Sequence, residues 1–400
     1  MANKITKQPE IRFKEFNNDW EQRKFKDFSI KTGKKNSKGL DYPAYSVSNK
    51  DGLVIQSEQF DGSRLDNLDK SAYKFVEPGE FAYNPARINV GSIAFNNLES
   101  TVIVSSLYVV VKMSNLLDNQ FILQYIKSPT FINEVKRNTE GSVREYLFFE
   151  NFKNIKFPYT PNIEEQQKIG AFFKSLDDTI ALQNCKLEEM QLYKKAMLQK
   201  MFPKNGEKAP EIRFDGYNDD WEQRKLGEVA KFNPKSQLPD EFEYVDLESV
   251  VGTSLISHRT ENKENAPSRA QRLAKKGDVF YQTVRPYQKN NYLFDMPYDN
   301  YVFSTGYAQL RPHGDSYFLL SRIQEERFVS NVLDRSTGTS YPAINSTDLA
   351  QIDLTIPKEF EEQQKIGALF KSLDDTIALQ NNKLNKLKEM KKVLLQKMFV

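Results

Sequence analysis

The segments EEQQKIGAFFKSLDDTIALQNCKL, residues 164–187, and EEQQKIGALFKSLDDTIALQNNKL, residues 361–384, are two copies of one sequence within a single chain of 400 residues. They are identical at 22 of 24 aligned positions, at a constant offset of 197. A second repeat precedes each half, and we call its copies the entry stretches. They read PEIRFKEFNNDWEQRK at 9–24 and PEIRFDGYNDDWEQRK at 210–225, with 12 of 16 positions identical. The chain is therefore organised as two halves with one plan.

The two modules that lie between the repeats, residues 25–163 and 226–360, share little sequence but show the same order of predicted elements. GEFAY at 79–83 and GDVFY at 277–281 are matching strands, and helical segments, a glycine-containing turn and a last strand follow in both. The apolar run TVIVSSLYVVV at 101–111 is expected to be one buried strand. Two divergent modules on two copies of one scaffold indicate a protein that recognises two different targets.

The repeated segments carry a heptad pattern that predicts two long helices. Apolar or glutamine residues recur at alternating spacings of four and three, which is the spacing of a coiled-coil seam. Because such a helix cannot fold alone, we expect the two to pair antiparallel and to relate the two halves by a pseudo-two-fold axis. The predicted fold class is therefore α+β, with two mixed α/β modules joined by two long antiparallel coiled-coil helices. The seam positions are Ile169, Phe173, Leu176, Ile180, Gln183 and Leu187 in the first copy, and Ile366, Phe370, Leu373, Ile377, Gln380 and Leu384 in the second.

Polar residues of the repeated helix are duplicated as faithfully as the seam. Lys168, Lys174, Asp177 and Asp178 all recur at the offset of 197. Packing of the seam requires only the apolar positions. The repeated polar residues therefore predict a surface that contacts two copies of one partner.

Basic and polar residues at matching places in the two modules are candidates for contact with nucleic acid. Arg87 and Arg285 each follow, by four residues, a tyrosine in a strand-like run. Arginine can bond guanine with two parallel hydrogen bonds, whereas Lys, Ser and Thr commonly bond phosphates. For any one of these residues, a surface salt bridge or simple solvation is the alternative role. The candidates are Lys34, Lys35, Arg87, Arg137, Ser142 and Arg144 in the first module, and Arg285, Lys289, Arg335, Thr337, Thr339 and Tyr341 in the second.

Signs of catalysis are sparse. The two histidines, His258 and His313, lie near no cysteine, and the phosphate-binding motifs GxxxxGK[ST] and GxGxxG are absent. Pro239-Asp240 followed by Glu261-Asn262-Lys263 matches the loose PD…ExK spacing of Mg²⁺-dependent nucleases, but this pattern arises often by chance and the first module lacks it. Neither a catalytic site nor a metal site is predicted.

Charge and cysteine content narrow the class of protein further. The net charge is only +3, so binding to a polyanion requires a local basic surface. The single cysteine, Cys185, excludes an internal disulfide and suits a reducing cytoplasm. MANKITKQPE lacks the apolar core of a signal peptide, and the run 101–111 is too short to span a bilayer. A soluble, cytoplasmic protein without membrane contact is expected.

The repeated helix QQKIGAFFKSLDDTIALQNCKL, alternating with divergent modules, resembles the specificity subunit of type I restriction–modification systems. WEQRKFKDF and WEQRKLGEV resemble the usual entry into each target-recognition domain of that family. The resemblance implies target-recognition domains at 1–163 and 204–360, and coiled-coil helices at 164–203 and 361–400. It also implies that each domain reads one half of a bipartite site in double-stranded DNA, while the helices set the spacer and dock the modification subunits.

The resemblance also implies partners and cofactors. Two modification subunits would transfer methyl groups from S-adenosylmethionine to adenine, and two restriction subunits would use ATP and Mg²⁺. The chain itself would be non-catalytic and would bind none of these cofactors. Two other interpretations stay open from the residues: a stand-alone Mg²⁺-dependent nuclease, and a coiled-coil adaptor without DNA contact.

Overall fold

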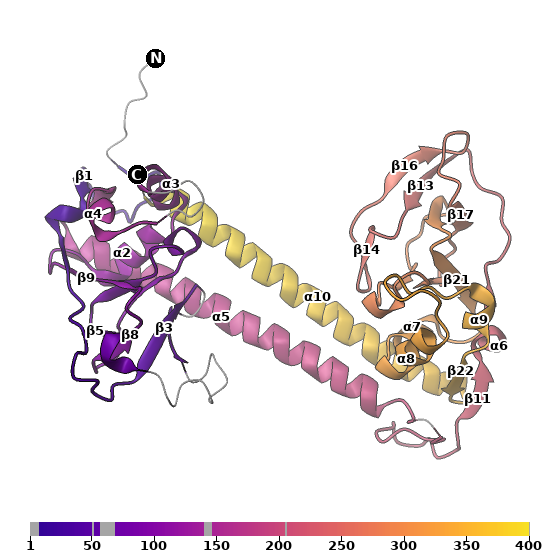
Figure 1. Cartoon of the computed structure of the whole chain (residues 1–400). Helices are drawn as coiled ribbons and strands as arrows, with labels where there is room; N and C mark the ends of the chain where they lie inside the picture. The colour runs from indigo at the N-terminus through magenta and orange to yellow at the C-terminus, as the bar shows by residue number, and fades with distance from the viewer. Residues whose placement is uncertain (1–7, 50–51, 57–68, 140–145, 205, 400) are drawn as a thin grey trace. The chain divides into compact units, whose positions relative to one another are not determined.

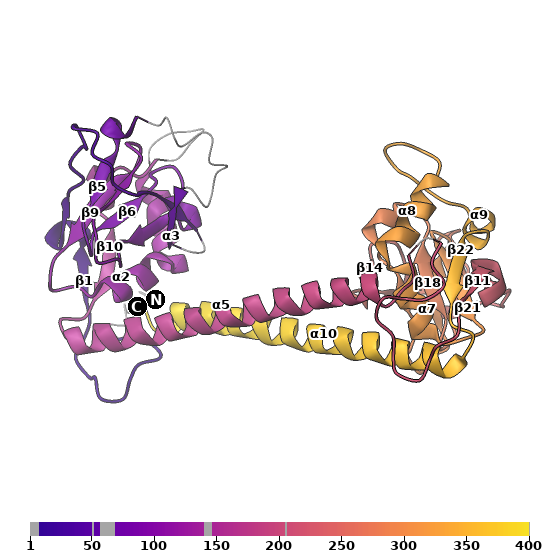
Figure 2. The same cartoon turned by 90° about the horizontal axis from the view of Figure 1, so that it is seen from below.

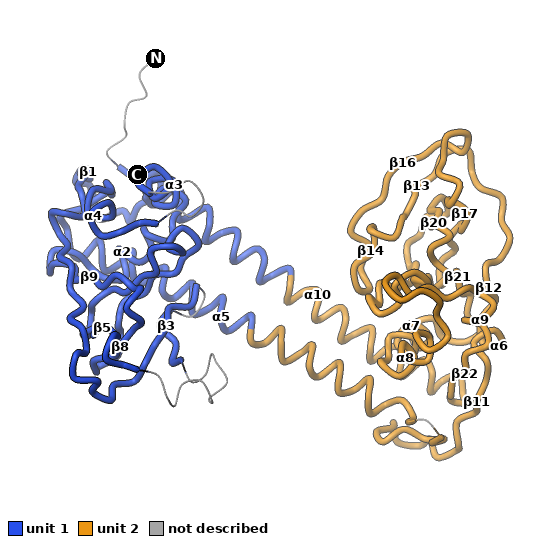
Figure 3. Tube along the Cα trace, viewed as in Figure 1, with its two compact units in different colours: residues 1–184, 382–400 blue, residues 185–381 orange. Residues whose placement is uncertain are grey.

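The computed structural model describes residues 8–49, 52–56, 69–139, 146–204 and 206–399, which form two compact units (Figure 3). Unit 1 comprises 1–184 with 382–400, and unit 2 comprises 185–381. Two helices of 38 residues, α5 (Ile163–Lys200) and α10 (Phe360–Lys397), each contribute one part to each unit. Each unit therefore combines one divergent module with segments of both repeated helices.

Outside the two long helices, the described residues of unit 1 contain ten short strands and three short α-helices, several of which are labelled in Figure 1. The strands are β1 (Glu21–Lys24), β2 (Ser29–Lys31), β3 (Ala44–Ser48), β4 (Gly52–Ile55), β5 (Lys74–Val76), β6 (Phe81–Tyr83), β7 (Ile93–Phe95), β8 (Val102–Val104), β9 (Val109–Met113) and β10 (Lys156–Tyr159). The helices are α2 (Asn119–Ile126), α3 (Pro129–Asn138) and α4 (Phe149–Phe152). One sheet has the order β2-β9-β6-β7 and the other has the order β4-β3-β8-β5, in which β3 and β8 are parallel. Strand β1, at the end of the entry stretch, pairs antiparallel with β10, the last strand of the module.

The module of unit 2 repeats this topology. Its strands are β11 (Glu222–Lys225), β12 (Ala230–Phe232), β13 (Glu241–Val245), β14 (Val250–Val251), β15 (Ser254–Leu255), β16 (Arg259–Asn262), β17 (Ala270–Leu273), β18 (Val279–Gln282), β19 (Tyr292–Leu293), β20 (Tyr301–Ser304), β21 (Tyr307–Pro312) and β22 (Asp353–Ile356). Its helices are α6 (Leu226–Val229), α7 (Ser316–Ile323), α8 (Glu326–Asp334) and α9 (Ser346–Ala350).

The sheet orders β12-β21-β18-β19 and β16-β13-β20-β17 match those of unit 1 strand for strand, including one parallel pair, β13 with β20. The hairpin β14-β15 is an addition between β13 and β16. The prediction that both modules share one mixed α/β fold is confirmed.

The run 101–111 is not the single strand that its composition predicts. It is divided into β8 and the start of β9 by a turn in which the N–H of Tyr108 donates to the carbonyl of Ser105. The two strands then enter different sheets. Serine residues favour such turns because their side chains compete for backbone hydrogen bonds.

Within unit 1, residues 163–184 of α5 lie beside residues 382–397 of α10 (Figure 1, Figure 2). Asp177 forms an ion pair with Lys391, and Ile169 and Phe173 share a buried cluster with Leu395. Because an early part of α5 packs on a late part of α10, the two segments run antiparallel.

Unit 2 contains the same arrangement with the roles exchanged. An ion pair joins Lys194 of α5 to Asp374 of α10, and the rings of Phe202 and Phe370 stack with centroids 5.8 Å apart. The predicted antiparallel pairing of the helices is therefore confirmed within each unit. Among the proposed seam positions, Ile180, Leu373, Ile377 and Gln380 are half-buried, while Ile169, Phe173, Leu176, Gln183, Leu187, Ile366, Phe370 and Leu384 are buried.

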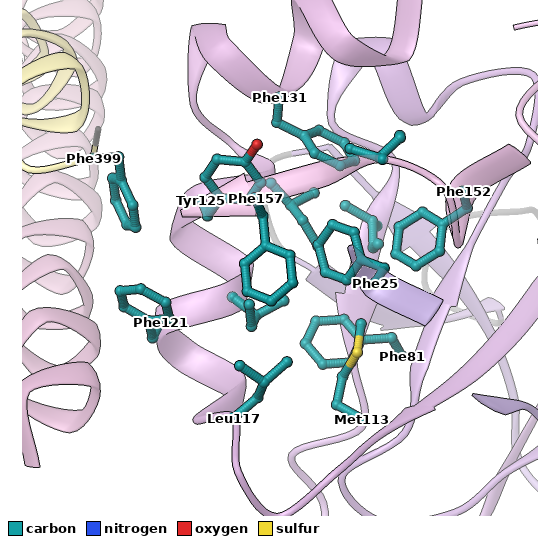
Figure 4. Packing of buried hydrophobic residues seen from close by; sticks show 14 of the residues in the cluster. Phe25, Phe81, Met113, Leu117, Phe121, Tyr125, Phe131, Phe152, Phe157 and Phe399 are labelled. Carbon is teal, nitrogen blue, oxygen red and sulfur yellow. The ribbon is translucent and has the colours of Figure 1, made fainter. Parts of the chain in front are cut away.

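The core of the first module is dense in aromatic rings (Figure 4). Phe25 stacks on Phe152 and Phe157, with ring centroids 4.6 and 4.5 Å apart. Phe399, which follows α10, packs on Phe121 of α2 with ring centroids 5.3 Å apart, and Figure 4 shows it facing this helix. Leu395, Met398 and Phe399 thus belong to the core of the first module.

Candidate nucleic-acid interface

Each module is anchored to its helix by a buried ion pair between the two kinds of repeat. Arg12 of the entry stretch donates from Nε and Nη2 to the carboxylate of Glu165 in α5, at 2.6 and 2.9 Å. Trp20 Nε1 and Thr160 Oγ1 also donate to this carboxylate, which is fully buried. Charges out of water must be paired and hydrogen-bonded, so these residues hold one another in place.

Unit 2 contains the same anchor. Arg213 donates from Nε and Nη2 to Glu362 at 2.7 and 2.9 Å, and Trp221 Nε1 donates to the same carboxylate. The bond to this carboxylate raises the pKa of Arg213. These contacts explain why the entry stretches and the helices are repeated together.

A glycine in each helix allows close approach of a module helix. A Cβ atom on Gly170 would lie 2.8 Å from Oδ1 of Asp118, the N-cap of α2, and 2.9 Å from the backbone nitrogen of Phe121. A Cβ on Gly367 would meet Asp315, the N-cap of α7, and would lie 2.9 Å from the nitrogen of Phe318. The modules therefore sit on their helices through equivalent contacts.

Several repeated polar residues are occupied within the chain. Asp177 accepts from Gln124 of α2 as well as from Lys391. Asp374 accepts from Tyr317 of α7 as well as from Lys194. Contacts within the chain therefore account for the repetition of these two carboxylates, and the predicted partner surface stays a prediction. The exposed pairs Lys174–Asp178 and Lys371–Asp375 lie along the helices and remain available on the surface.

Four of the candidate residues in the second module gather around one loop. The segment 337–343 folds back on itself through a bridge between Thr337 and Ala343, and Ala343 also bridges Val284. This places Arg285 beside the loop, with its N–H donating to the carbonyl of Pro342 at 2.8 Å. The Arg285 guanidinium carbon lies 4.5 Å from the ring centroid of Tyr341. The structure thus brings Arg285 together with Tyr341 and with the exposed Thr337 and Thr339 of the same loop.

The other two candidates of this module lie near the same surface but differ in their partners. Lys289 follows the 3₁₀ turn η5 (Pro286–Gln288) and forms an ion pair with Glu326 at 2.8 Å. Arg335 is the exposed C-cap residue of α8, and no described carboxylate pairs with it.

Arg87 occupies the place in the first module that Arg285 occupies in the second. Each directly precedes a 3₁₀ turn, η4 (Ile88–Val90) or η5, that follows equivalent strands. Their backbones differ, because φ is −136° at Arg87 and +54° at Arg285. The Arg87 side chain is exposed and pairs with no described carboxylate.

The remaining candidates of the first module are spread over its surface. Lys34 and Lys35 are exposed, and Lys34 borders a hollow with Glu77 and Glu80, which precede β6, whereas Arg87 follows β6. Arg137 is exposed at the end of α3 and pairs with Glu134 at 2.7 Å. No described contact joins these residues to Arg87, and Ser142 and Arg144 lie outside the described residues.

Two features of the second module escape prediction from the sequence. Asn233, Arg285 and Lys289 are the described non-glycine residues with positive φ, and all three belong to this module. In addition, the N–H of Gly252 in the β14-β15 hairpin donates to Asn290 Oδ1 at 2.9 Å, which ties the hairpin to the chain after η5. Because asparagine tolerates positive φ, Asn233 is a weak sequence signal for this backbone conformation. Arginine and lysine give no such signal at 285 and 289.

The acidic residue of the ExK pattern has a partner within the second module. Glu261 accepts a hydrogen bond from Arg259 at 2.7 Å, so this carboxylate is already engaged. Across the described ranges, no cluster of three or more His, Cys, Asp or Glu side chains is arranged to hold a metal ion. The described helices also include none that is long and apolar enough to cross a membrane.

Comparison with known proteins adds an independent observation. The family model for the type I restriction modification DNA specificity domain matches residues 17–192 and 218–389. The specificity subunit of the type I restriction enzyme HindI from Haemophilus influenzae is 28% identical over 195 residues, a match that covers 45% of this chain and 41% of the relative. The MjaVIII specificity subunit from Methanocaldococcus jannaschii is 24% identical over 314 residues, covering 73% of this chain and 72% of the relative.

Solved structures share the fold. A crystal structure of the S subunit of a type I restriction–modification system from M. genitalium superposes with a TM-score of 0.63 at 14% identity, covering 98% of this chain and 99% of that one. A chain from a structure that addresses complex assembly and conformational transition of the type I system has a TM-score of 0.53 at 18% identity, with coverages of 95% and 97%. At such identities the likeness concerns the fold alone.

Proposed function

The chain belongs to the family of type I restriction modification DNA specificity domains, and from this premise we propose that it is the DNA-recognition subunit of a type I restriction–modification complex. Each module reads one half of a bipartite site in double-stranded DNA. The observation that carries this proposal is the pair of modules with one sheet topology, divergent sequences and near-identical anchors. A common fold on a repeated scaffold keeps the geometry of binding, while divergent surfaces change what is read.

The candidate residues supply chemistry for both kinds of contact with DNA. Exposed Lys34, Lys35 and Arg87 in the first module suit phosphates, which position a protein on a duplex. The loop that carries Thr337 and Tyr341, with Arg285 beside it, suits base edges because it presents aromatic and hydrogen-bonding groups together.

The same proposal covers partners and cofactors. Two modification subunits dock on the repeated helices, and two restriction subunits complete the complex in the cytoplasm. S-adenosylmethionine, ATP and Mg²⁺ belong to those subunits, and this chain contributes recognition without catalysis. The exposed polar pairs that recur on α5 and α10 support docking of two copies of one subunit. Because both helices continue without a break from one unit to the other, their length sets the spacer.

Exchange of a module tests the proposal. Residues 25–159 would be replaced by the equivalent module of a relative, which leaves Arg12, Trp20 and Glu165 in place. Mapping of methylated adenines in cells that carry the whole system should show a change in one half of the site, with the other half and the spacer intact. The matched control exchanges residues 226–356 and should change the opposite half. Changes in both halves from a single exchange, or in neither, would contradict the proposal.

Two further measurements separate the alternatives. A stand-alone nuclease would cut DNA as the purified chain with Mg²⁺ alone. An adaptor would show no salt-dependent binding to DNA even when the modification subunits are present.

A further inference from the structure

The backbone of Arg285 is held in a conformation that arginine rarely adopts. Its φ and ψ are +54° and +56°, in the left-handed region. The bond from its N–H to the Pro342 carbonyl and the bond from the Gln288 N–H to its own carbonyl, at 2.8 and 3.0 Å, fix it from both sides. Strained residues of this kind persist where the surroundings determine them, and they concentrate at functional sites.

The side chain of Arg285 is half-buried, and its hydrogen-bond donors are not all paired. Its Nε is buried and has no hydrogen-bond partner, and no described carboxylate pairs with its guanidinium. Arg259 and Arg311 in the same module each pair with a carboxylate. The guanidinium of Arg285 instead lies over the ring of Tyr341, which is itself 64% exposed. Stacking fixes the plane of the guanidinium.

The segments around Arg285 carry exposed apolar side chains. Tyr287 of η5 is 49% exposed and Val251 of the β14-β15 hairpin is 57% exposed. The bond between Gly252 and Asn290 ties that hairpin to the segment after η5. In the first module, η4 follows Arg87 directly, and no described ring lies over the Arg87 guanidinium. The two modules thus present different chemistry at the same place in the fold.

We propose that Arg285 is a base-reading residue of the second module and that it contacts the O6 and N7 acceptors of a guanine in the major groove. This inference rests on the proposed function. A planar guanidinium with a fixed orientation matches these two acceptors. The exposed apolar side chains of Tyr287 and Val251 suit base edges and thymine methyl groups. A phosphate contact requires only positive charge, which a lysine supplies without a strained backbone or a stacked ring.

The test compares Arg285→Lys, which keeps the charge, with Arg285→Gly, which removes the side chain and tolerates positive φ. Once methylation mapping has defined the site of the wild-type complex, binding is measured on duplexes in which each G·C pair of the second module's half-site is replaced by A·T. Wild type should discriminate at one position by between about fivefold and about 150-fold. Both variants should lose that discrimination, and Arg285→Lys should keep the wild-type salt dependence.

One result would overturn the inference, and further variants serve as controls. If Arg285→Gly keeps the wild-type discrimination, the residue does not read a base and is a phosphate contact or has a structural role. Tyr341→Phe keeps the stacked ring and should keep the discrimination, and Arg224→Lys, an exposed arginine paired with Glu222, should change nothing. Melting temperature is measured for each variant to check that it folds. If Arg285→Gly fails to fold, Tyr341→Ser, which loses the stacked ring, takes its place as the test of discrimination. Absence of bipartite methylation in wild type would contradict the proposed function, whereas an unchanged site in the variants contradicts only the inference.

Discussion

At the scale of single residues, Glu165 and Glu362 each hold an entry stretch against a repeated helix. A carboxylate without solvent contact is stable only while its partners remain, and in both units these include an arginine and a tryptophan from the entry stretch. The first pair joins residues 153 positions apart in the chain and the second pair joins residues 149 apart. One side chain in each half therefore links the start of a module to its end.

Substitution of this carboxylate should be severe. Glu165→Ala leaves the largely buried Arg12 without its partner, so the free energy of unfolding should fall by about 3–5 kcal/mol. Glu164→Ala is the matched control, because the carboxylate of Glu164 is exposed. Its loss should lower the free energy of unfolding by at most about 0.5 kcal/mol. Chemical denaturation of the two variants measures the difference. Equal losses would show that the buried pair does not anchor the module.

Arg87 is the corresponding test for contact with phosphate. Because its side chain is exposed and lacks a described carboxylate, Arg87→Ala should leave the melting temperature unchanged. Affinity should fall for all DNA sequences alike, and the slope of log affinity against log salt should flatten by about one ion. Arg23→Ala serves as control, because Arg23 is already paired with Glu21 and Asp27. Salt titration of DNA binding by the assembled complex tests this prediction. An unchanged slope with unchanged affinity would show that Arg87 does not contact DNA.

At the scale of elements, each module helix is seated against a repeated helix at a glycine. Alanine normally favours a helix over glycine by about 1 kcal/mol. At Gly170 and Gly367 this preference competes with a clash against an N-cap carboxylate and a backbone nitrogen, neither of which can move without loss of the cap. Overpacking of this kind costs about 1–3 kcal/mol, so the clash should dominate.

Gly170→Ala and Gly367→Ala should therefore each destabilise the chain despite the better helix propensity of alanine. Ser372→Ala is the control, since this position of α10 is exposed and alanine there should be neutral or stabilising by a few tenths of a kcal/mol. Thermal unfolding of the three variants provides the comparison. A rise in melting temperature for the glycine variants would mean that the module helices do not approach as closely as described.

At the scale of the whole molecule, both helices pass from one unit into the other, between Asn184 and Cys185 in α5 and between Asn381 and Asn382 in α10. Insertion of one heptad at both points keeps the seam pattern and adds about 10 Å of helix. The spacer of the methylated site should lengthen by about three base pairs, because ten base pairs occupy about 34 Å.

A single insertion is the control for this experiment. A heptad added to α5 alone displaces its second part relative to α10 and should disrupt the Lys194–Asp374 or Asp177–Lys391 pair. That variant should lose stability or assembly without producing a longer spacer. If the double insertion methylates the original site with normal efficiency, the helices do not set the spacer.

The sequence by itself was sufficient to predict how the chain is divided into helices and modules. Heptad spacing and near-identity at an offset of 197 predicted two helices and two modules, because side-chain periodicity along a helix is a local property. The equivalence of Arg87 and Arg285 was also within reach, since both follow matching strands.

Only the tertiary structure decided which residues meet. Four features depend on contacts between segments that are separated in the sequence: the pairing of Arg12 with Glu165, the packing of α2 on Gly170, the division of 101–111 between two sheets and the stack of Arg285 on Tyr341. Periodicity reports which face of an element is apolar but not which distant element covers it. The strained backbone of Arg285 has the same origin, because contacts from two separated segments impose a conformation that its own residue type disfavours.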